Sequence, residues 1–394
     1  MLTQTLDQQY LAHTYNRFPL EIVGGKGSLL RGADGREYID LGSGIGVNIF
    51  GMDDDEWRNA VTAQLGRFQH VSNLYYSEPA AKLAQMLCER TGLKRVFFSN
   101  SGAESNECAI KAARKWAAEH KGPEYCSIIT LRGSFHGRTL TTVTATGQDT
   151  FHKFFGPFTP GFRYVPAGDL AALERQLDAE DCSAVLVEIV QGEGGVRALD
   201  ADYLKAVEAL CHEKNVLFCV DEVQTGNGRT GTWFAYEQFG LSPDLVSTAK
   251  GLGNGLPIGA TLMGPKTAEV LTPGTHGSTF GGNPVACAGA LSVLEQIDDA
   301  FLEAVKQKGA WLTAELEKIP GVKDVSGLGL MLGFSVEGCK SADIKAKALD
   351  NGLVVLTAKD RVRLLPPLAI TEEELSDGLL RLAAAIREVQ EAAH

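Results

Sequence analysis

Two apolar runs near the middle of the chain each lead into a charged residue. Residues 216–220 (Val-Leu-Phe-Cys-Val) end at Asp221, and residues 243–247 come shortly before Lys250 in Ser-Thr-Ala-Lys-Gly-Leu-Gly-Asn-Gly. Short apolar runs bounded by turn residues are typical of strands buried on both faces of a sheet. Because a charge at the end of a buried strand is costly without a partner, we expect Asp221 and Lys250 to meet a common ligand.

Strand-like and helix-like segments alternate through the central part of the chain. Strand candidates lie at residues 95–99, 127–131, 184–190, 216–220, 243–247 and 257–263. The helix expected after residues 95–99 has an apolar stripe at helical spacing, formed by Ala109, Ala112, Ala113, Trp116 and Ala117. This alternation predicts an α/β fold in which helices flank a mostly parallel sheet.

The pattern changes near residue 285. Residues 284–318 predict one long helix, and short strands are expected at 331–336, 354–356 and 362–365. A last helix begins at the capping-box pattern Thr371-x-x-Glu374. We predict a large domain at residues 51–284 and a smaller α+β C-terminal domain at residues 285–394, on which a glycine-rich N-terminal segment, residues 1–50, packs.

Composition excludes several classes of function. The net charge of −12 disfavours a surface that follows nucleic-acid phosphates. The eight cysteines are scattered without a Cys-x-x-Cys pair, which predicts neither a disulfide framework nor a metal site. The N-terminus lacks a secretion-signal pattern and no apolar stretch is long enough to span a membrane, so we expect a cytoplasmic protein.

Two turns after predicted strands are candidates for ligand contacts. Ser101-Gly102-Ala103 opens the helix after residues 95–99, where exposed N–H groups could cradle a phosphate or where Ser101 could simply cap the helix. In the turn after residues 127–131, Phe135 could stack on a flat ring and Arg138 could bind a carboxylate. The alternatives are a core phenylalanine and a solvated arginine, and we expect His136 to be a hydrogen-bonded loop residue.

Pyridoxal phosphate fits these features. This cofactor needs an amine to hold its aldehyde as an imine and a carboxylate to keep its ring nitrogen protonated, as Lys250 and Asp221 could do. Gln224 could then reach the ring hydroxyl, although Asp221 could instead be an N-cap for the turn after it. No Walker sequence, His-Glu-x-x-His or Gly-x-Ser-x-Gly is present, which disfavours nucleotide, zinc-peptidase and serine-hydrolase sites.

Taken together, these segments resemble the class III, fold-type I aminotransferases that use pyridoxal phosphate, and within that class the acetylornithine branch. The resemblance rests on Asp221-Glu-Val-Gln-Thr-Gly followed by Ser-Thr-Ala-Lys250, on Gln191-Gly-Glu-Gly-Gly, and on residues 278–284. It implies a seven-stranded, mostly parallel sheet and a homodimer with shared active sites. It also implies that Lys250 binds the cofactor covalently and transfers a proton, and that Asp221 keeps the cofactor ring able to withdraw electrons. Thr279 would contact the phosphate of the cofactor from the partner subunit.

The resemblance also implies how the substrates bind. Arg138 and Ser278 would contact acetylornithine, and Arg363 would bind the α-carboxylate of glutamate. Glu193 would pair with Arg363 when that carboxylate is absent, although a solvated loop carboxylate is the alternative. The expected reaction transfers the terminal amino group of N2-acetylornithine to 2-oxoglutarate in ping-pong fashion, a step of arginine biosynthesis.

Other activities on the same scaffold stay open. The donor could be succinylornithine, ornithine or 4-aminobutyrate, or the protein could be an aminomutase of glutamate semialdehyde. A descendant without activity is disfavoured because Lys250, Asp221 and the phosphate turn are all present. Ornithine δ-aminotransferases carry a tyrosine near the position of Gly44, which favours an acetylated donor here, whereas Phe50-Gly-Met departs from the Gly-His often found in relatives.

Overall fold

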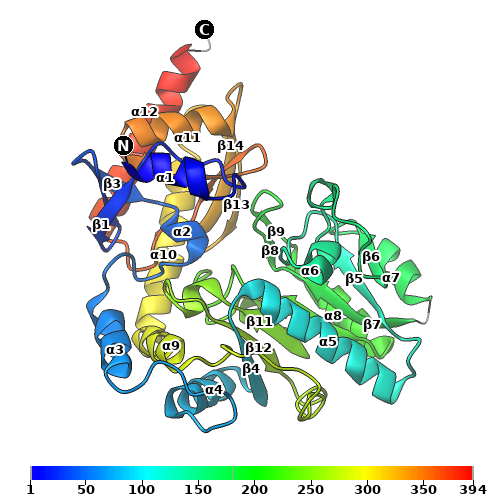
Figure 1. Ribbon diagram of the computed structural model, residues 1–394. Helices are drawn as coiled ribbons and strands as arrows, with labels where there is room; N and C mark the ends of the chain where they lie inside the picture. Colours follow the sequence, from blue (N-terminus) through cyan, green and yellow to red (C-terminus); the bar gives the residue numbers. More distant parts are fainter. Residues whose placement is uncertain (1, 180, 393–394) are drawn as a thin grey trace.

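The computed structural model describes residues 2–179 and 181–392, which include a large seven-stranded sheet (Figure 1). The strand order is β4-β12-β11-β10-β7-β5-β6. The strands are β4 (Arg95–Ser99), β5 (Ser127–Leu131), β6 (Phe162–Val165), β7 (Cys182–Val187), β10 (Leu217–Asp221), β11 (Leu245–Thr248) and β12 (Gly259–Met263). Strand β12 runs antiparallel to both of its neighbours, and the other pairs are parallel.

Apolar side chains on alternate positions of this sheet bury both of its faces. On β10, Leu217 and Cys219 pack in one cluster, whereas Phe218 and Val220 pack in the other. Helix α5 (Gly102–His120) covers the first face through its alanine-rich stripe. Helices α7 (Leu170–Leu177) and α8 (Ala201–Glu213) cover the second face. Burial on both faces explains why these strands read as continuous apolar runs.

Two smaller sheets are formed by the strands of the C-terminal part of the chain together with the N-terminal strands. Strands β13 (Val322–Leu328), β14 (Met331–Val336), β17 (Arg361–Leu364) and β16 (Leu356–Ala358) form one sheet in that order. The N-terminal strands β1 (Ile22–Lys26), β2 (Leu29–Gly32) and β3 (Glu37–Asp40) form another with β15 (Leu353–Val354), which pairs in parallel with β3. Helices α11 (Ser341–Asp350) and α12 (Glu372–Ala392) pack on one another in this region.

Two predicted elements differ from the structure. The long helix expected at residues 284–318 is wrong: it is two helices, α9 (Pro284–Gln296) and α10 (Asp299–Leu316). Asp298 separates them because its side chain accepts the Phe301 N–H and caps α10. The strand expected at 184–190 ends at Val187, and Val190–Gln191 forms the short β8 with β9 (Arg197–Ala198).

The remaining helices complete the chain around these sheets. Helices α3 (Asp55–Leu65) and α4 (Glu78–Thr91) pack against α9. The other α-helices of the described residues are α1 (Leu2–Tyr10), α2 (Ser43–Gly46) and α6 (Leu140–Ala145), and three short 3-10 helices are η1 (Asp149–Phe151), η2 (Ala235–Phe239) and η3 (Lys250–Leu252). The predicted domain boundaries, after residue 50 and after residue 284, stay a prediction. In the part of the chain that the structure describes, no helix is both long and apolar enough to cross a membrane.

Replacing Leu382 by alanine should lower the melting temperature clearly in scanning calorimetry of the purified protein. The Leu382 side chain is 0% exposed on α12, so its removal leaves a cavity, and such substitutions cost roughly 2–5 kcal/mol. Leu380, on the same helix, is 70% exposed and provides the matched control, because Leu380→Ala should change the melting temperature little. Equal shifts in the two variants would contradict the packing of α12.

Candidate active site

Several loops that follow parallel strands of the large sheet surround one cavity of about 430 Å³. Asp221 is the last residue of β10, and Lys250 follows β11. Cavities at the carboxyl ends of parallel strands are common ligand sites in α/β proteins. Eight of the residues predicted from the sequence line this cavity, namely Ser101, Gly102, Ala103, Phe135, Arg138, Asp221, Gln224 and Lys250.

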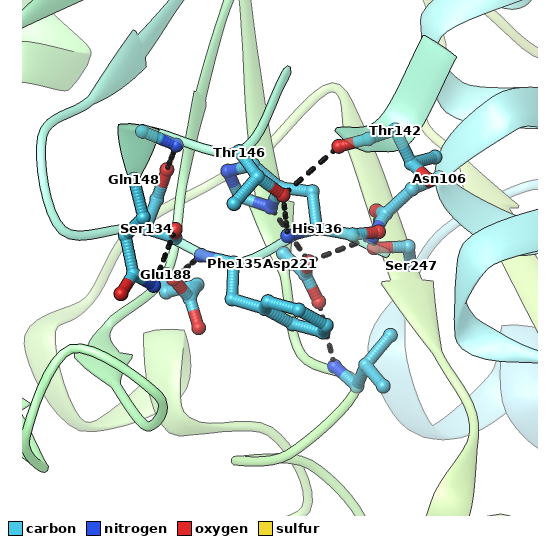
Figure 2. A network of polar contacts seen from close by, with 12 residues as sticks. Asn106, Ser134, Phe135, His136, Thr142, Thr146, Gln148, Glu188, Asp221 and Ser247 are labelled. Atoms are coloured by element: carbon cyan, nitrogen blue, oxygen red, sulfur yellow. Dashed lines mark hydrogen bonds and ion pairs between the residues drawn. The ribbon is translucent and has the colours of Figure 1, made fainter. Parts of the chain in front are cut away.

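Asp221 is only 4% exposed and three hydrogen-bond donors hold its carboxylate (Figure 2). Its Oδ2 accepts from Asn106 Nδ2 at 2.7 Å and from His136 Nδ1 at 2.8 Å, and its Oδ1 accepts from the Val223 N–H at 3.0 Å. His136 is therefore the hydrogen-bonded loop residue expected from the sequence, and its partner is Asp221. Multiple donors compensate for the burial of a negative charge, which fixes the orientation of this carboxylate.

Asn106 is a part of this network that the sequence prediction missed. It lies on the buried face of α5, and its Nδ2 also donates to the His136 carbonyl oxygen at 2.9 Å. Its Oδ1 accepts from Ser247 Oγ at 2.6 Å, which sets the orientation of the amide. Asn106 lies in line with Ala109 and Ala113 at helical spacing. A polar residue within this apolar stripe is the sequence signal that could have identified Asn106 as a functional residue.

Lys250 lies in a strained and poorly hydrated position. Its φ angle is +47°, in the left-handed region that residues other than glycine rarely occupy. Burial lowers the pKa of its amine to about 8 and the charge of Arg363 acts in the same direction, whereas Glu193 and Asp221 act to raise it. An amine with this pKa is partly uncharged near neutral pH, as a nucleophile or proton carrier requires.

The turn that opens α5 has the features of an anion-binding site. Ser101 is the N-cap, and its Oγ accepts the Glu104 N–H at 3.2 Å. The Gly102 and Ala103 N–H groups follow in the first turn, where no intrahelical acceptor exists, and both residues line the cavity. A Cβ at Gly102 would lie 2.5 Å from Val223 Cγ1, so glycine permits the close packing of this turn.

Two aromatic rings hold Arg138 at the cavity. Its guanidinium carbon lies 4.2 Å from the centre of the Phe151 ring and 5.5 Å from that of Phe135. Phe135 and Phe151 themselves meet edge to face. The exposed arginine is thus directed by cation–π contacts, which leave its N–H groups free to bind a carboxylate.

Comparison with known proteins identifies the family. The model of the aminotransferase class-III family matches residues 10–386. The chain belongs to this family. It is similar to the acetylornithine aminotransferase of Haemophilus ducreyi, with 50% identity over 98% of both chains, and to that of Bacillus subtilis, with 44% identity over 95% of this chain and 97% of the relative.

Solved structures of the family have the same fold. An ornithine aminotransferase from Toxoplasma gondii matches with a TM-score of 0.95 and 34% identity, covering 99% of this chain and 95% of that chain. An N-acetylornithine aminotransferase from Stenotrophomonas maltophilia matches with a TM-score of 0.86 and 37% identity, covering 98% and 99%. The predicted family and fold class are confirmed, and the protein is an aminotransferase that depends on pyridoxal phosphate.

The cavity of this aminotransferase fits its cofactor. The turn at Gly102 and Ala103 suits the phosphate, and the fixed carboxylate of Asp221 suits a protonated ring nitrogen. The buried Oε1 of Gln224 has no hydrogen-bond partner among the described residues, which is expected where a hydroxyl group of a ligand would donate to it. We propose that these residues, with Phe135 and Lys250, hold the cofactor.

Glu193 and Arg363 form an ion pair whose charges act on Lys250, although neither residue is among those that line the cavity. Arg363 Nη1 donates to Glu193 Oε1 at 2.5 Å, and Arg363 is only 3% exposed. Burial acts to raise the pKa of Glu193, but the charge and the hydrogen bond of Arg363, with smaller effects of Lys250 and Gln224, lower it below its ordinary value. Glu193 is therefore held as an anion rather than as a solvated loop carboxylate.

Ser278 and Thr279 lie outside the cavity in the single chain. Ser278 Oγ accepts from Asn100 Nδ2 at 3.1 Å, and Asn100 itself lines the cavity. Thr279 is exposed and borders a small hollow near residues 70–73. The predicted contact of Ser278 with substrate and the contribution of Thr279 to a partner subunit stay predictions.

Replacing Asn106 by leucine should weaken cofactor binding about tenfold or more, because Asp221 loses a donor to its charge. Hydrogen bonds to charged groups contribute about 1.5–3 kcal/mol, and 1.4 kcal/mol corresponds to tenfold. Affinity can be measured by titrating the cofactor-free protein and following tryptophan fluorescence. Cys108 is equally buried on the same helix, so Cys108→Ala is the control that should keep its affinity. Unchanged affinity in Asn106→Leu would refute this role.

Proposed function

We propose that this aminotransferase moves the terminal amino group of N2-acetylornithine to 2-oxoglutarate, giving N-acetylglutamate 5-semialdehyde and glutamate. The two curated relatives described above carry the name acetylornithine aminotransferase, and they match almost the whole chain. The overall fold does not identify the amino donor, because an ornithine aminotransferase is also similar to this chain over nearly the whole length of both proteins. The reaction would serve arginine biosynthesis in the cytoplasm.

The observation that carries the proposal is the ion pair between Glu193 and Arg363. Acetylornithine presents a terminal amine whose carbon bears no carboxylate, so Arg363 needs another partner while this donor is bound. Glu193 provides that partner at 2.5 Å. Glutamate and 2-oxoglutarate do carry a carboxylate beside the reacting carbon, and this group can replace Glu193 on the arginine. Two different substrates can then use one site without leaving a buried cation unpaired.

The residues of this chain divide the remaining tasks. Pyridoxal phosphate, when bound, supplies a ring that withdraws electrons from the carbon next to the reacting nitrogen. Lys250, with a pKa of about 8, can hold or release a proton at Nζ near neutral pH. Asp221 keeps a negative charge at the deep end of the cavity, and Arg138 binds the distal carboxylate of either substrate. Phe135 and Phe151 orient Arg138 and exclude water from one side.

A second copy of the chain completes the proposed site. Thr279 is exposed in the single chain and is available to reach the phosphate of a partner, next to the equally exposed Phe280. Leu74, Tyr75 and Tyr76 form another exposed apolar patch. Large exposed apolar groups favour burial in an interface, which supports a homodimer.

The preference for an acetylated donor is supported by the shape near Gly44. Gly44 has a φ angle of +62°, and the nearby Val47 lines the cavity. A Cβ at Gly44 would meet only Asn48 and Val47, both beyond 3.5 Å, so space remains on this side. No tyrosine hydroxyl occupies the position of Gly44 to bind a free α-amine, which favours N2-acetylornithine over ornithine.

Half-reaction spectra of the holoenzyme test the donor. We expect N2-acetylornithine alone to remove the visible absorbance of the lysine-bound cofactor, because the amino group stays on the enzyme. We expect 2-oxoglutarate, but not pyruvate, to restore that absorbance. Succinylornithine, ornithine and 4-aminobutyrate are the comparison donors and should react more slowly. A faster response to one of these amines would replace the proposed donor while keeping the aminotransferase reaction.

Replacing Glu193 by glutamine should slow the half-reaction with acetylornithine but not the half-reaction with glutamate. Without the negative charge, Arg363 is left poorly paired while acetylornithine is bound, so that half-reaction should slow about tenfold or more. Glutamate no longer displaces a carboxylate, so its half-reaction should keep its rate or gain affinity. Stopped-flow absorbance measures both rates, and the exposed Asp360→Asn is the control. If both half-reactions keep their wild-type rates, Glu193 is not a switch.

A further inference from the structure

One buried carboxyl group in the cavity has no task in the chemistry above. Glu188 directly follows β7, lines the cavity, and is 6% exposed. Its Oε2 accepts the Phe135 N–H at 2.9 Å (Figure 2). Glu193, which lies beyond the short β8, is paired with Arg363, whereas Glu188 forms no ion pair with a cation in residues 2–179 and 181–392. The two glutamates on either side of β8 therefore have opposite electrostatic surroundings.

The surroundings of Glu188 disfavour its ionised form. Burial and then the nearby Asp221 raise the pKa of Glu188 well above its ordinary value, and Glu193 adds to this effect. The Phe135 N–H and the charge of Lys250 act in the opposite direction but do not outweigh burial. Two neighbouring buried carboxyl groups do not both ionise readily, and Asp221 has the larger number of donors.

Glu188 and Asp221 hold adjacent residues of one loop. Glu188 binds the main chain of Phe135, and Asp221 binds the ring of His136, the next residue. The Phe135 side chain lines the cavity and also contacts Arg138, so its position sets one side of the site. A fixed main chain at residue 135 is therefore needed for both cofactor and substrate contacts.

We infer that Glu188 is a positioning residue that acts as an uncharged acid, whose carboxyl group accepts the Phe135 N–H and fixes the Phe135 ring at the cavity. A protonated carboxyl keeps a carbonyl oxygen for this bond. It adds no second negative charge beside Asp221, whose carboxylate accepts from three donors. This role depends on the aminotransferase site but not on which amine is the donor.

Two variants separate the hydrogen bond that Glu188 accepts from the charge that Glu188 could carry, namely Glu188→Gln and Glu188→Ala. Glutamine keeps a neutral carbonyl acceptor at the same distance from the main chain, so cofactor affinity should stay within about twofold of wild type. Alanine leaves the Phe135 N–H without its partner, so affinity should fall about tenfold. Titration of the cofactor-free proteins, followed by fluorescence, measures both. If alanine leaves the affinity unchanged, the positioning role is wrong.

The pKa of the Lys250 amine reports the protonation state of Glu188. In the cofactor-free protein, the pH dependence of Lys250 acylation, measured by mass spectrometry of its peptide, gives the pKa of the amine. The charged groups that act on this amine are Glu193, Arg363, Asp221 and, if ionised, Glu188. An ionised Glu188 raises the pKa of Lys250, so its replacement by glutamine would lower that pKa.

We expect the Lys250 titration to have the same midpoint in Glu188→Gln as in wild type, because an uncharged Glu188 does not act on the amine. A clear downward shift would show that Glu188 is ionised and would overturn the inference, even if the transamination reaction were unchanged. Glu188→Asp is a second variant, because it keeps an acid but withdraws it from the Phe135 N–H. It should lose cofactor affinity as alanine does, and wild-type affinity would contradict the positioning role.

Discussion

The buried negative charge of Asp221 is the interaction on which the rest of this site depends. A carboxylate that is 4% exposed is stable as an anion only where donors replace the water it has lost. Those donors come from a helix, from the loop after β5 and from the turn after β10. The sheet must therefore bring three separate segments to one point before the charge can be tolerated. A ligand with a protonated ring nitrogen then meets a site whose electrostatics are already organised.

The segments that surround the cavity approach one another more closely than ordinary side chains allow. At Gly102, a Cβ would overlap the side chain of Val223, so the helix that carries the anion-binding N–H groups lies directly against the turn after Asp221. Lys250 takes a left-handed backbone conformation just after its strand. Such strain is tolerated where the surrounding structure fixes the chain, as the buried strands β10 and β11 do here. The turn proposed to bind the phosphate thus packs directly on the side chain of Val223, two residues after Asp221.

Much of the fold and of the candidate site could be predicted from the sequence, for identifiable reasons. The central strands are buried on both faces, so each is a run of apolar residues in the sequence. Asp221 comes at the end of one such run, and Lys250 follows another closely. The break between α9 and α10 was not predicted because it depends on a single capping residue, Asp298, within a continuous helical pattern. The contacts of Asn106 join positions far apart in the sequence, so no local pattern reveals its partner. The proposed contact of Thr279 with the phosphate would come from a second chain, whose position one sequence does not give.

The placement of the two glutamates after β7 explains how one cavity can serve two substrates of different charge. Arg363 is almost fully buried, so its charge needs a partner at each stage of a ping-pong reaction. In the proposed function, an exchange of one carboxylate for another at Arg363 keeps this buried cation paired. Glu188 cannot substitute for Glu193 in this exchange, because it is held by the main chain of Phe135 rather than by the arginine. In this proposal, a charged carboxylate pairs with Arg363 and a neutral acid holds the main chain of Phe135.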